Sequence, residues 1–310
     1  MSFKDRLKVM RRQASLLVEL PWRCGFHAAG RLAPIRARPW SATGTDRVFV
    51  IAPHPDDEAI ACSGTLLQHV AAGDEVVVAI ATDGRLSKQA GTPDEMAAIR
   101  KNEAVLAARA LGIGRLEWLG LREGDWEAAE LQGLLCALLQ RYEPTIVYAP
   151  SRVDFHPEHH SVAHSLAQAL EQRQAAAPVA AGMRVRIYQV QVPLTRILAN
   201  VVADVSAVAA ESTAALHAYE SQAGTVDSAH RCRRYAALAH GVRGPVEEFW
   251  EVTLEQYTEV HRGRCDEWLG KFRGVRRFAW TDPLAYWLGN AERRRLQAAA
   301  MRLATQGGAA

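Results

Sequence analysis

Short apolar segments alternate with amphipathic segments along residues 46–192. The apolar segments are nearly continuous and rich in Val and Ile, which is typical of strands buried on both faces. The segments between them repeat apolar residues at helical spacing. This alternation predicts an α/β fold of Rossmann-like type, with a mainly parallel sheet and helices on both faces. The predicted strands are 47–53, 75–82, 116–121, 145–150 and 185–192, and the predicted helices are 59–72, 93–111, 128–142 and one that follows Pro157.

Beyond residue 200 the pattern is weaker. It predicts helices over 206–222 and 227–240 and a strand over 249–254. We therefore expect one α/β domain over 46–262, preceded by a basic amphipathic extension (1–45) and followed by a basic, aromatic extension (263–310).

Two clusters of titratable residues lie where predicted strands end. The first is His54-Pro-Asp-Asp-Glu58, and the second runs from Asp154 to His160 (DFHPEHH). If the two strands are neighbours in a parallel sheet, both clusters meet at the same edge, where ligands bind in such folds. Imidazoles and carboxylates together are the ligand set of zinc and similar divalent ions. A bound cation would offset the repulsion between the packed carboxylates.

The helix after Pro157 offers a choice between neighbouring histidines. His159 shares a stripe with the apolar residues that should face the sheet, whereas His160 and His164 fall on a more polar stripe. We therefore predict His159 as a metal ligand and interpret His160 and His164 as a solvated face. His156, at the start of the helix, can point across the site without binding the metal.

Four motifs in order resemble the LmbE-like, PIG-L-type family of zinc-dependent N-acetylglucosaminyl deacetylases. They are HPDDE at 54–58, TDG at 82–84, the stretch from Arg100 through Gly112, and DxHPEH at 154–159. The resemblance covers residues 46–165 well and extends loosely to about 260. It implies a Rossmann-like hydrolase that removes an acetyl group from a GlcNAc-containing substrate.

The resemblance also implies roles for individual residues. His54, Asp57 and His159 would bind zinc, Asp56 would be the general base, and His156, protonated, would stabilise the oxyanion. This sequence has Glu158 where the family commonly has Asp, and a longer carboxylate there is expected to orient His156.

Other polar residues near the predicted edge have more than one expected role. Asp83 and Arg85 follow the second strand, so they either contact substrate hydroxyl or phosphate groups or form a simple turn. Asp154 is a further candidate for substrate contact. Glu58 either stabilises the first turn of its helix or takes part in catalysis. Arg100 and Glu103 lie three residues apart on a predicted helix and are expected to form a solvated ion pair.

The charges are unevenly distributed, although the formal net charge is only +3. Residues 1–40 hold nine Lys and Arg against two acidic residues, and residues 261–310 hold ten against four. Apolar residues recur at helical spacing through Phe3, Leu7, Met10, Ala14 and Leu17, which is typical of a helix that lies on an anionic membrane surface. Packing of both ends on the core, or in a homo-oligomer, is the alternative. No nucleic-acid-binding motif accompanies the basic residues.

Cysteine usage and hydropathy indicate a compartment. The five cysteines are widely spaced without a CxxC pair, which favours reduced thiols and a cytoplasmic protein. The basic ends add the expectation of peripheral contact at the inner membrane face. We expect neither a signal peptide nor a membrane-spanning helix, because the apolar runs are short.

The expected function is zinc-dependent hydrolysis of the acetamide of an N-acetylated amino sugar. The sugar is either free or part of a glycoconjugate, and lipid-linked glycoconjugates are included. Fe²⁺ is the alternative to Zn²⁺. The alternative functions are an amidase acting on a small thiol conjugate or an antibiotic intermediate, and a metal-binding scaffold without activity.

Overall fold

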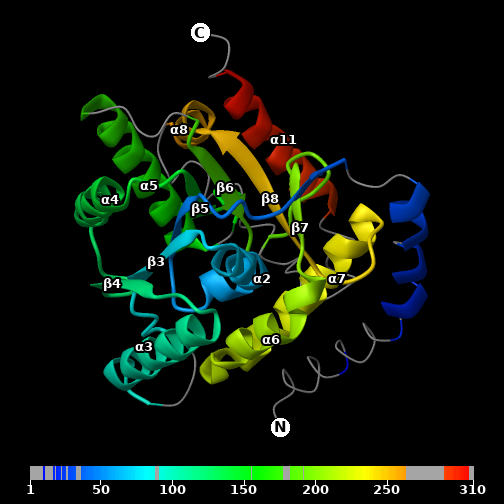
Figure 1. Cartoon of the computed structure of the whole chain (residues 1–310), viewed down its shortest axis with the longest axis horizontal. Helices are drawn as coiled ribbons and strands as arrows, with labels where there is room; N and C mark the ends of the chain where they lie inside the picture. Colours follow the sequence, from blue (N-terminus) through cyan, green and yellow to red (C-terminus); the bar gives the residue numbers. More distant parts are fainter. Residues whose placement is uncertain are drawn as a thin grey trace.

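The structure is a computed structural model of the chain. It describes residues 36–87, 91–154, 156–176, 182–190, 192–262 and 290–306, and before them residues 10, 17 and most of 19–32. Figure 1 shows a central sheet with helices packed on both of its faces.

Eight strands form the sheet in the order β1-β7-β8-β6-β5-β2-β3-β4. Neighbouring strands are parallel, except that β8 runs antiparallel to both β6 and β7. The strand order reverses between β2 and β5, because the chain continues from β2 toward β3 and β4 on one side and from β5 toward β6 on the other. The strands are β1 (Arg38–Trp40), β2 (Arg47–Ala52), β3 (Glu75–Thr82), β4 (Arg115–Leu121), β5 (Ile146–Pro150), β6 (Arg184–Tyr188), β7 (Val201–Asp204) and β8 (Val246–Thr253).

Two apolar layers hold the helices against the sheet. Alternate residues of β2 point to opposite faces: Phe49 and Ile51 pack with one set of helices, and Val48 and Val50 with the other. The first set comprises α4 (Ala128–Tyr142), α5 (Pro157–Ala176), α8 (Leu254–His261) and α11 (Asn290–Gln306). The second comprises α2 (Asp57–Ala72), α3 (Pro93–Ala110), α6 (Ala209–His217) and α7 (Ala223–His240), with the 3-10 turns η1 (Ser206–Val208) and η2 (Glu220–Gln222) beside α6.

The predicted fold class is confirmed, and the elements predicted between residues 46 and 176 lie within two residues of their expected bounds, whereas the short strand β1 was not predicted. Beyond that point several predictions need correction. β6 ends at Tyr188, not at Val192, and the single helix expected over 206–222 is broken at Ala218–Tyr219. Tyr219, at the break between α6 and η2, is 1% exposed.

Some structured segments lie outside the 46–262 range predicted for the α/β domain. β1 pairs with β7, and α11 packs through Leu296 and Ala300 into the same apolar layer as α8. Most of the predicted N-terminal amphipathic helix and the aromatic segment 263–289 lie outside the described residues. Met10 and Leu17 are described, and both are exposed. Among the helices that the structure describes, none is long and apolar enough to cross a bilayer.

His261, the last residue of α8, provides a test of this packing. It is buried, its Nδ1 lies 2.8 Å from the Tyr257 carbonyl oxygen, and its Nε2 has no hydrogen-bond partner among the described residues. Burial, with Arg152 nearby, lowers the pKa of His261 from 6.5 to about 3. Below about pH 6.5 the unfolded chain therefore takes up a proton that the folded chain does not, and stability falls as the pH falls.

We expect this one group to reduce the free energy of unfolding by ~2 kcal/mol between pH 7 and pH 5. His261→Asn, which cannot titrate in this range, should show a correspondingly smaller loss. Urea denaturation of both proteins at the two pH values measures the difference. An identical pH dependence in the two proteins would contradict the buried neutral state of His261.

Candidate metal and catalytic site

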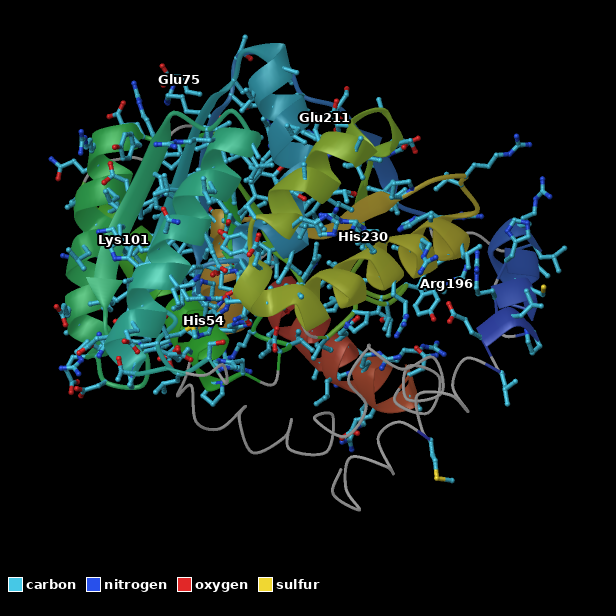
Figure 2. The ribbon with its side chains drawn as sticks, turned by 90° about the horizontal axis from the view of Figure 1, so that it is seen from below. His54, Glu75, Lys101, Arg196, Glu211 and His230 are labelled. Carbon is cyan, nitrogen blue, oxygen red and sulfur yellow. The ribbon has the colours of Figure 1, made fainter. Side chains whose placement is uncertain are left out.

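The two polar clusters meet where the strand order of the sheet reverses. Residues 53–56 connect β2 to α2, which begins at Asp57, and residues 151–156 connect the neighbouring strand β5 to α5. In open α/β sheets this crevice is where ligands bind. Figure 2 shows His54 at the opposite end of the sheet from Glu75, the first residue of β3.

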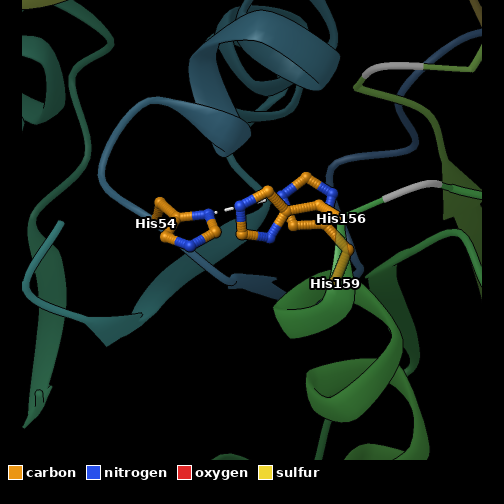
Figure 3. A group of neighbouring side chains, drawn as sticks. All are labelled: His54, His156 and His159. Carbon is orange, nitrogen blue, oxygen red and sulfur yellow. Dashed lines mark hydrogen bonds between the residues drawn. The ribbon is translucent and has the colours of Figure 1, made fainter. Parts of the chain in front are cut away.

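Three imidazoles lie together at this position (Figure 3). Each of His54, His156 and His159 offers a nitrogen, and these nitrogens lie within 4.8 Å of one another. His54 and His159 are buried and His156 is half-buried. The group is therefore a candidate metal site, as the sequence predicted for His54 and His159.

Asp57 adds a carboxylate to two of these imidazoles. Its Oδ2 lies 3.3 Å from His54 Nδ1 and 3.3 Å from His159 Nε2, and these two nitrogens are themselves 3.3 Å apart. A tetrahedral ion with bonds of 2.0–2.1 Å separates its ligand atoms by about 3.3 Å. The three atoms thus form a triangle that fits the ligands of one zinc ion.

The outer nitrogen of each imidazole in this triangle contacts a second carboxylate. His54 Nε2 lies 2.5 Å from Glu158 Oε2, and His159 Nδ1 lies 3.0 Å from Asp154 Oδ2. Such a carboxylate holds the proton on the outer nitrogen and leaves the inner lone pair available to a metal. Burial alone would lower the pKa of His54, but its hydrogen bonds to Asp57 and Glu158 outweigh burial and raise it to about 9. The site therefore stabilises positive charge.

The position of Glu158 differs from its expected one. We expected it to orient His156, but its carboxylate contacts His54 and also accepts hydrogen bonds from the Gly124 backbone and the Trp126 indole, at 2.7 and 2.9 Å. The extra methylene of Glu, compared with Asp, gives it this reach. Asp154, a candidate for substrate contact, is 1% exposed and faces His159.

Glu158→Gln is expected to lower zinc affinity about 10- to 100-fold, the range for such supporting partners. The amide that replaces Oε2 would donate toward His54 Nε2, so His54 would carry its proton on the inner nitrogen instead. Chelator competition measures the affinity. Glu123→Gln is the matched control, since Glu123 also lies near His54, at 3.7 Å, without meeting hydrogen-bond geometry. Turnover lost without any change in zinc affinity would support the original expectation that Glu158 orients His156.

Asp56 and Asp57 are adjacent but lie in different surroundings. Asp57 is held by imidazoles, which outweigh burial and keep its pKa well below the usual range. Asp56 instead faces Arg100, with Oδ1 3.3 Å from the guanidinium, and burial raises its pKa to about 6 despite that charge. Two carboxylates whose pKa values are separated in this way can take different roles in one reaction.

Asp56 also has an unusual backbone. Its φ of 124° and ψ of −25° lie outside the regions open to L-residues, and such strain typically costs about 1–3 kcal/mol. The conformation directs the Asp56 and Asp57 side chains toward different partners. Contacts around the residue must therefore hold it in place.

His156 is placed as a neutral hydrogen-bond donor. The Glu158 backbone N–H donates to His156 Nδ1 over 3.3 Å, so the proton of the neutral ring lies on Nε2. Burial, together with the charges of His159 and His54, lowers the pKa of His156 to about 4. These surroundings favour the neutral ring, and the protonated oxyanion donor expected from the resemblance stays a prediction.

Asp83 and Arg85 are bonded mainly to each other. Arg85 Nε donates to Asp83 Oδ2 over 2.7 Å, and Arg85 also reaches Asp94 on α3. Asp83 Oδ1 accepts the Glu123 backbone N–H over 3.2 Å. These contacts tie together the loops after β3 and β4, and substrate contact by Asp83 or Arg85 stays a prediction.

The solvated ion pair expected on α3 is wrong. Arg100 and Glu103 are 3% and 6% exposed, and neither faces solvent. Arg100 donates to the Pro55 carbonyl oxygen and faces Asp56, so sequence reasoning missed a residue that contacts the site. The sequence did contain a signal that Arg100 is buried. Arg100 lies on the same helix face as Met96 and Ala104, and that face is buried along α3.

The glycine of the TDG motif, Gly84, leaves room for the side chain of Arg100. Gly84 has φ +67°, and a Cβ there would lie 2.8 Å from Arg100 Nε and 3.0 Å from Pro55 Cδ.

The prediction that His160 lies on a solvated face is also wrong. His160 is fully buried, and its Nε2 lies 2.6 Å from the Asp154 carbonyl oxygen.

Comparison with known proteins agrees with this geometry. Residues 49–170 match the PIG-L family, described as GlcNAc-PI de-N-acetylase. A probable N-acetyl-α-D-glucosaminyl L-malate deacetylase 2 of Bacillus anthracis is 28% identical over 133 residues, which cover 40% of this chain and 58% of that protein. The chain thus spans about three-fifths of the length of the first curated relatives it matches.

Solved structures extend the similarity beyond the matched segment. A conserved protein of Thermus thermophilus superposes with a TM-score of 0.57 at 28% identity, covering 66% of this chain and 94% of that one. The N,N'-diacetylchitobiose deacetylase of Pyrococcus horikoshii superposes with a TM-score of 0.58 at 20% identity, covering 83% and 95%, and shows the common fold. Residues 49–170, which carry both polar clusters, thus match the PIG-L/LmbE-like family of GlcNAc de-N-acetylases, as the sequence motifs predicted.

Proposed function

We propose that the chain is a zinc-dependent de-N-acetylase that hydrolyses the acetamide of an N-acetylglucosamine-type sugar in a glycoconjugate. The observation that carries this proposal is the 3.3 Å triangle of His54, Asp57 and His159, followed by the arrangement of Asp56, the residue next to Asp57, whose carboxylate is held separately by Arg100. A scaffold that only binds metal has no need for that second carboxylate.

The proposed roles follow from the donors and acceptors at the site. A zinc ion held by His54, Asp57 and His159 would supply Lewis-acid chemistry, polarising the acetamide carbonyl and making water more acidic. Asp56 accepts the proton of the attacking water at its carboxylate and returns it to the leaving amine. His156 donates its Nε2–H to the oxygen that becomes negatively charged as the amide is attacked.

Glu158 and Asp154 hold the outer protons of His54 and His159, which keeps the inner nitrogens free. Arg100 faces the carboxylate of Asp56, and Gly84 leaves room for it. Each group in the proposed reaction therefore has a neighbour that fixes its direction.

Several partner assignments are part of the same proposal. An N-acetylated amino sugar is the substrate class that the family implies. Contact with an anionic membrane stays a prediction, and the exposed side chains of Met10, Leu17 and Leu20 are compatible with it. The division into an α/β unit over 46–262 and basic extensions at 1–45 and 263–310 stays a proposal, in which β1 and α11 of the extensions pack on that unit.

Acetate release tests the function. The full-length protein, loaded with zinc, is offered free GlcNAc, diacetylchitobiose, and GlcNAc linked to malate, inositol or lipid, and acetate is quantified. We expect release from at least one conjugate, its loss on chelation, and its recovery with added zinc. Stoichiometric zinc binding without acetate release from any of these compounds would favour the scaffold, and release from N-acetylated thiol conjugates alone would favour the amidase.

A further inference from the structure

The peptide group between Pro55 and Asp56 is held at both of its polar atoms. The Pro55 carbonyl oxygen accepts a hydrogen bond from Arg100, and the Asp56 N–H donates to Glu58 Oε2 over 3.3 Å. The next carbonyl, that of Asp56, accepts the Ile60 N–H over 2.8 Å as α2 begins. Two buried side chains, Arg100 and Glu58, thus fix the plane of the peptide that gives Asp56 its strained φ of 124°.

Tyr219 contacts both of these side chains. Its hydroxyl donates to Glu58 Oε1, the oxygen that does not face Asp56. The Arg100 guanidinium carbon lies 5.9 Å from the centre of the Tyr219 ring, in cation–π position. The tyrosine is 1% exposed, so no water competes for its hydroxyl from the surface.

The turn that carries Tyr219 is itself anchored to α3. Glu103 accepts hydrogen bonds from the Ser221 backbone N–H and hydroxyl, both at 2.7 Å, and Glu103 lies one turn along α3 from Arg100. The Gln222 N–H also bonds back to the Tyr219 carbonyl oxygen over 2.9 Å. This explains why the chain departs from helical geometry at Tyr219, which lies between α6 and η2 and outside the segment that matches the family.

We propose that Tyr219 is a positioning residue for Asp56, acting through Glu58 and Arg100. This rests on the proposed role of Asp56 as the base of a deacetylase. The Tyr219 hydroxyl fixes the Glu58 carboxylate, Glu58 fixes the Asp56 N–H, and the strained peptide keeps the Asp56 carboxylate beside the metal ligands without joining them. Glu58, for which the sequence left two roles open, is the link in this chain of contacts.

Tyr219→Phe tests the proposal because it keeps the ring and removes the hydroxyl. We expect kcat to fall about tenfold at saturating zinc, with KM and zinc affinity each within about threefold of wild type. Hydrogen–deuterium exchange of the segment 53–60 should accelerate, since the Asp56 amide loses its fixed acceptor. Glu58→Gln should give a similar loss of kcat, and the double variant should lose little more, because both changes break the same link.

Tyr148→Phe is the matched control. The Tyr148 hydroxyl is also buried among charged and polar groups, accepting from Arg186 at 2.6 Å and lying 2.9 Å from His69 Nε2, but it is not in contact with Asp56 or Glu58. This variant should lose stability while keeping wild-type kcat and wild-type exchange in 53–60. Thermal unfolding of both variants gives the stability comparison.

Wild-type kcat in Tyr219→Phe, or an equal loss of kcat in Tyr148→Phe, would overturn the proposal. If Tyr219→Phe does not fold, Glu58→Gln takes its place, and wild-type kcat there has the same meaning. If the wild-type protein releases no acetate, the proposed function fails instead, and the exchange of 53–60 still decides whether Tyr219 fixes this peptide.

Discussion

Asp56→Asn is expected to bind zinc as tightly as the wild type and to lose about 10²- to 10⁴-fold in turnover, the range for general acid–base groups. Asn has the shape of Asp and can still accept from Arg100, which faces Asp56 at 3.3 Å. It cannot accept the proton of the attacking water or return one to the leaving amine. The loss should therefore appear in kcat, with the metal site intact.

Zinc stoichiometry and acetate release, measured on the same sample, check this result. Asp204→Asn is the control for the chemical change, since Asp204 is exposed on β7 and bonds locally to the Ser206 N–H. More than a tenth of wild-type turnover in Asp56→Asn would rule out Asp56 as the base. Loss of zinc in that variant would place Asp56 among the ligands.

His159→Ala is expected to lower zinc affinity by about a thousandfold or more and to abolish turnover at ordinary zinc concentrations. A four-coordinate zinc site has about 10–16 kcal/mol of binding free energy, so each protein ligand contributes several kcal/mol. Removing this imidazole also leaves Asp154 without the partner that its carboxylate faces. Zinc titration against a chelator of known affinity measures the change.

His156→Ala separates two ligand sets. If His54, Asp57 and His159 hold the ion, His156→Ala should keep zinc and lose turnover through the missing oxyanion donor. If the three imidazoles hold it instead, His156→Ala should lose zinc as completely as His159→Ala, and Asp57→Ala should keep it. The second pattern would contradict the proposed roles of both Asp57 and His156.

The sequence predicts the central part of the fold well because that part depends on local signals. The strands from β2 to β5 are apolar runs, the helices between them have clear periodicity, and HPDDE and HPEH follow strands directly. Once both motifs are placed at strand ends, the topology of a parallel sheet brings them together. The bounds of the C-terminal elements were predicted less well, because β7 is only four residues long and β8 runs antiparallel to both of its neighbours.

Individual contacts at the site depend on how far each side chain reaches, and hydrophobic periodicity carries no information about that distance. Glu158 differs from the family's Asp by one methylene, yet it reaches His54 instead of His156. Arg100 was missed because its spacing of three residues from Glu103 was interpreted as a solvated ion pair. Tyr219 belongs to a turn that no local pattern predicts, since the turn is fixed by Glu103 on another helix.

The triangle of ligand atoms also has a consequence for how the chain folds. Its members come from two segments a hundred residues apart in sequence, and the pairing of β2 with β5 brings these segments together. An ion that binds this arrangement and not the unfolded chain acts as a cross-link between the two halves of the sheet. At a zinc concentration a thousand times its dissociation constant, such a cross-link adds about 4 kcal/mol to the free energy of unfolding. The concentration of available metal would then determine the stability of the folded protein as well as its activity.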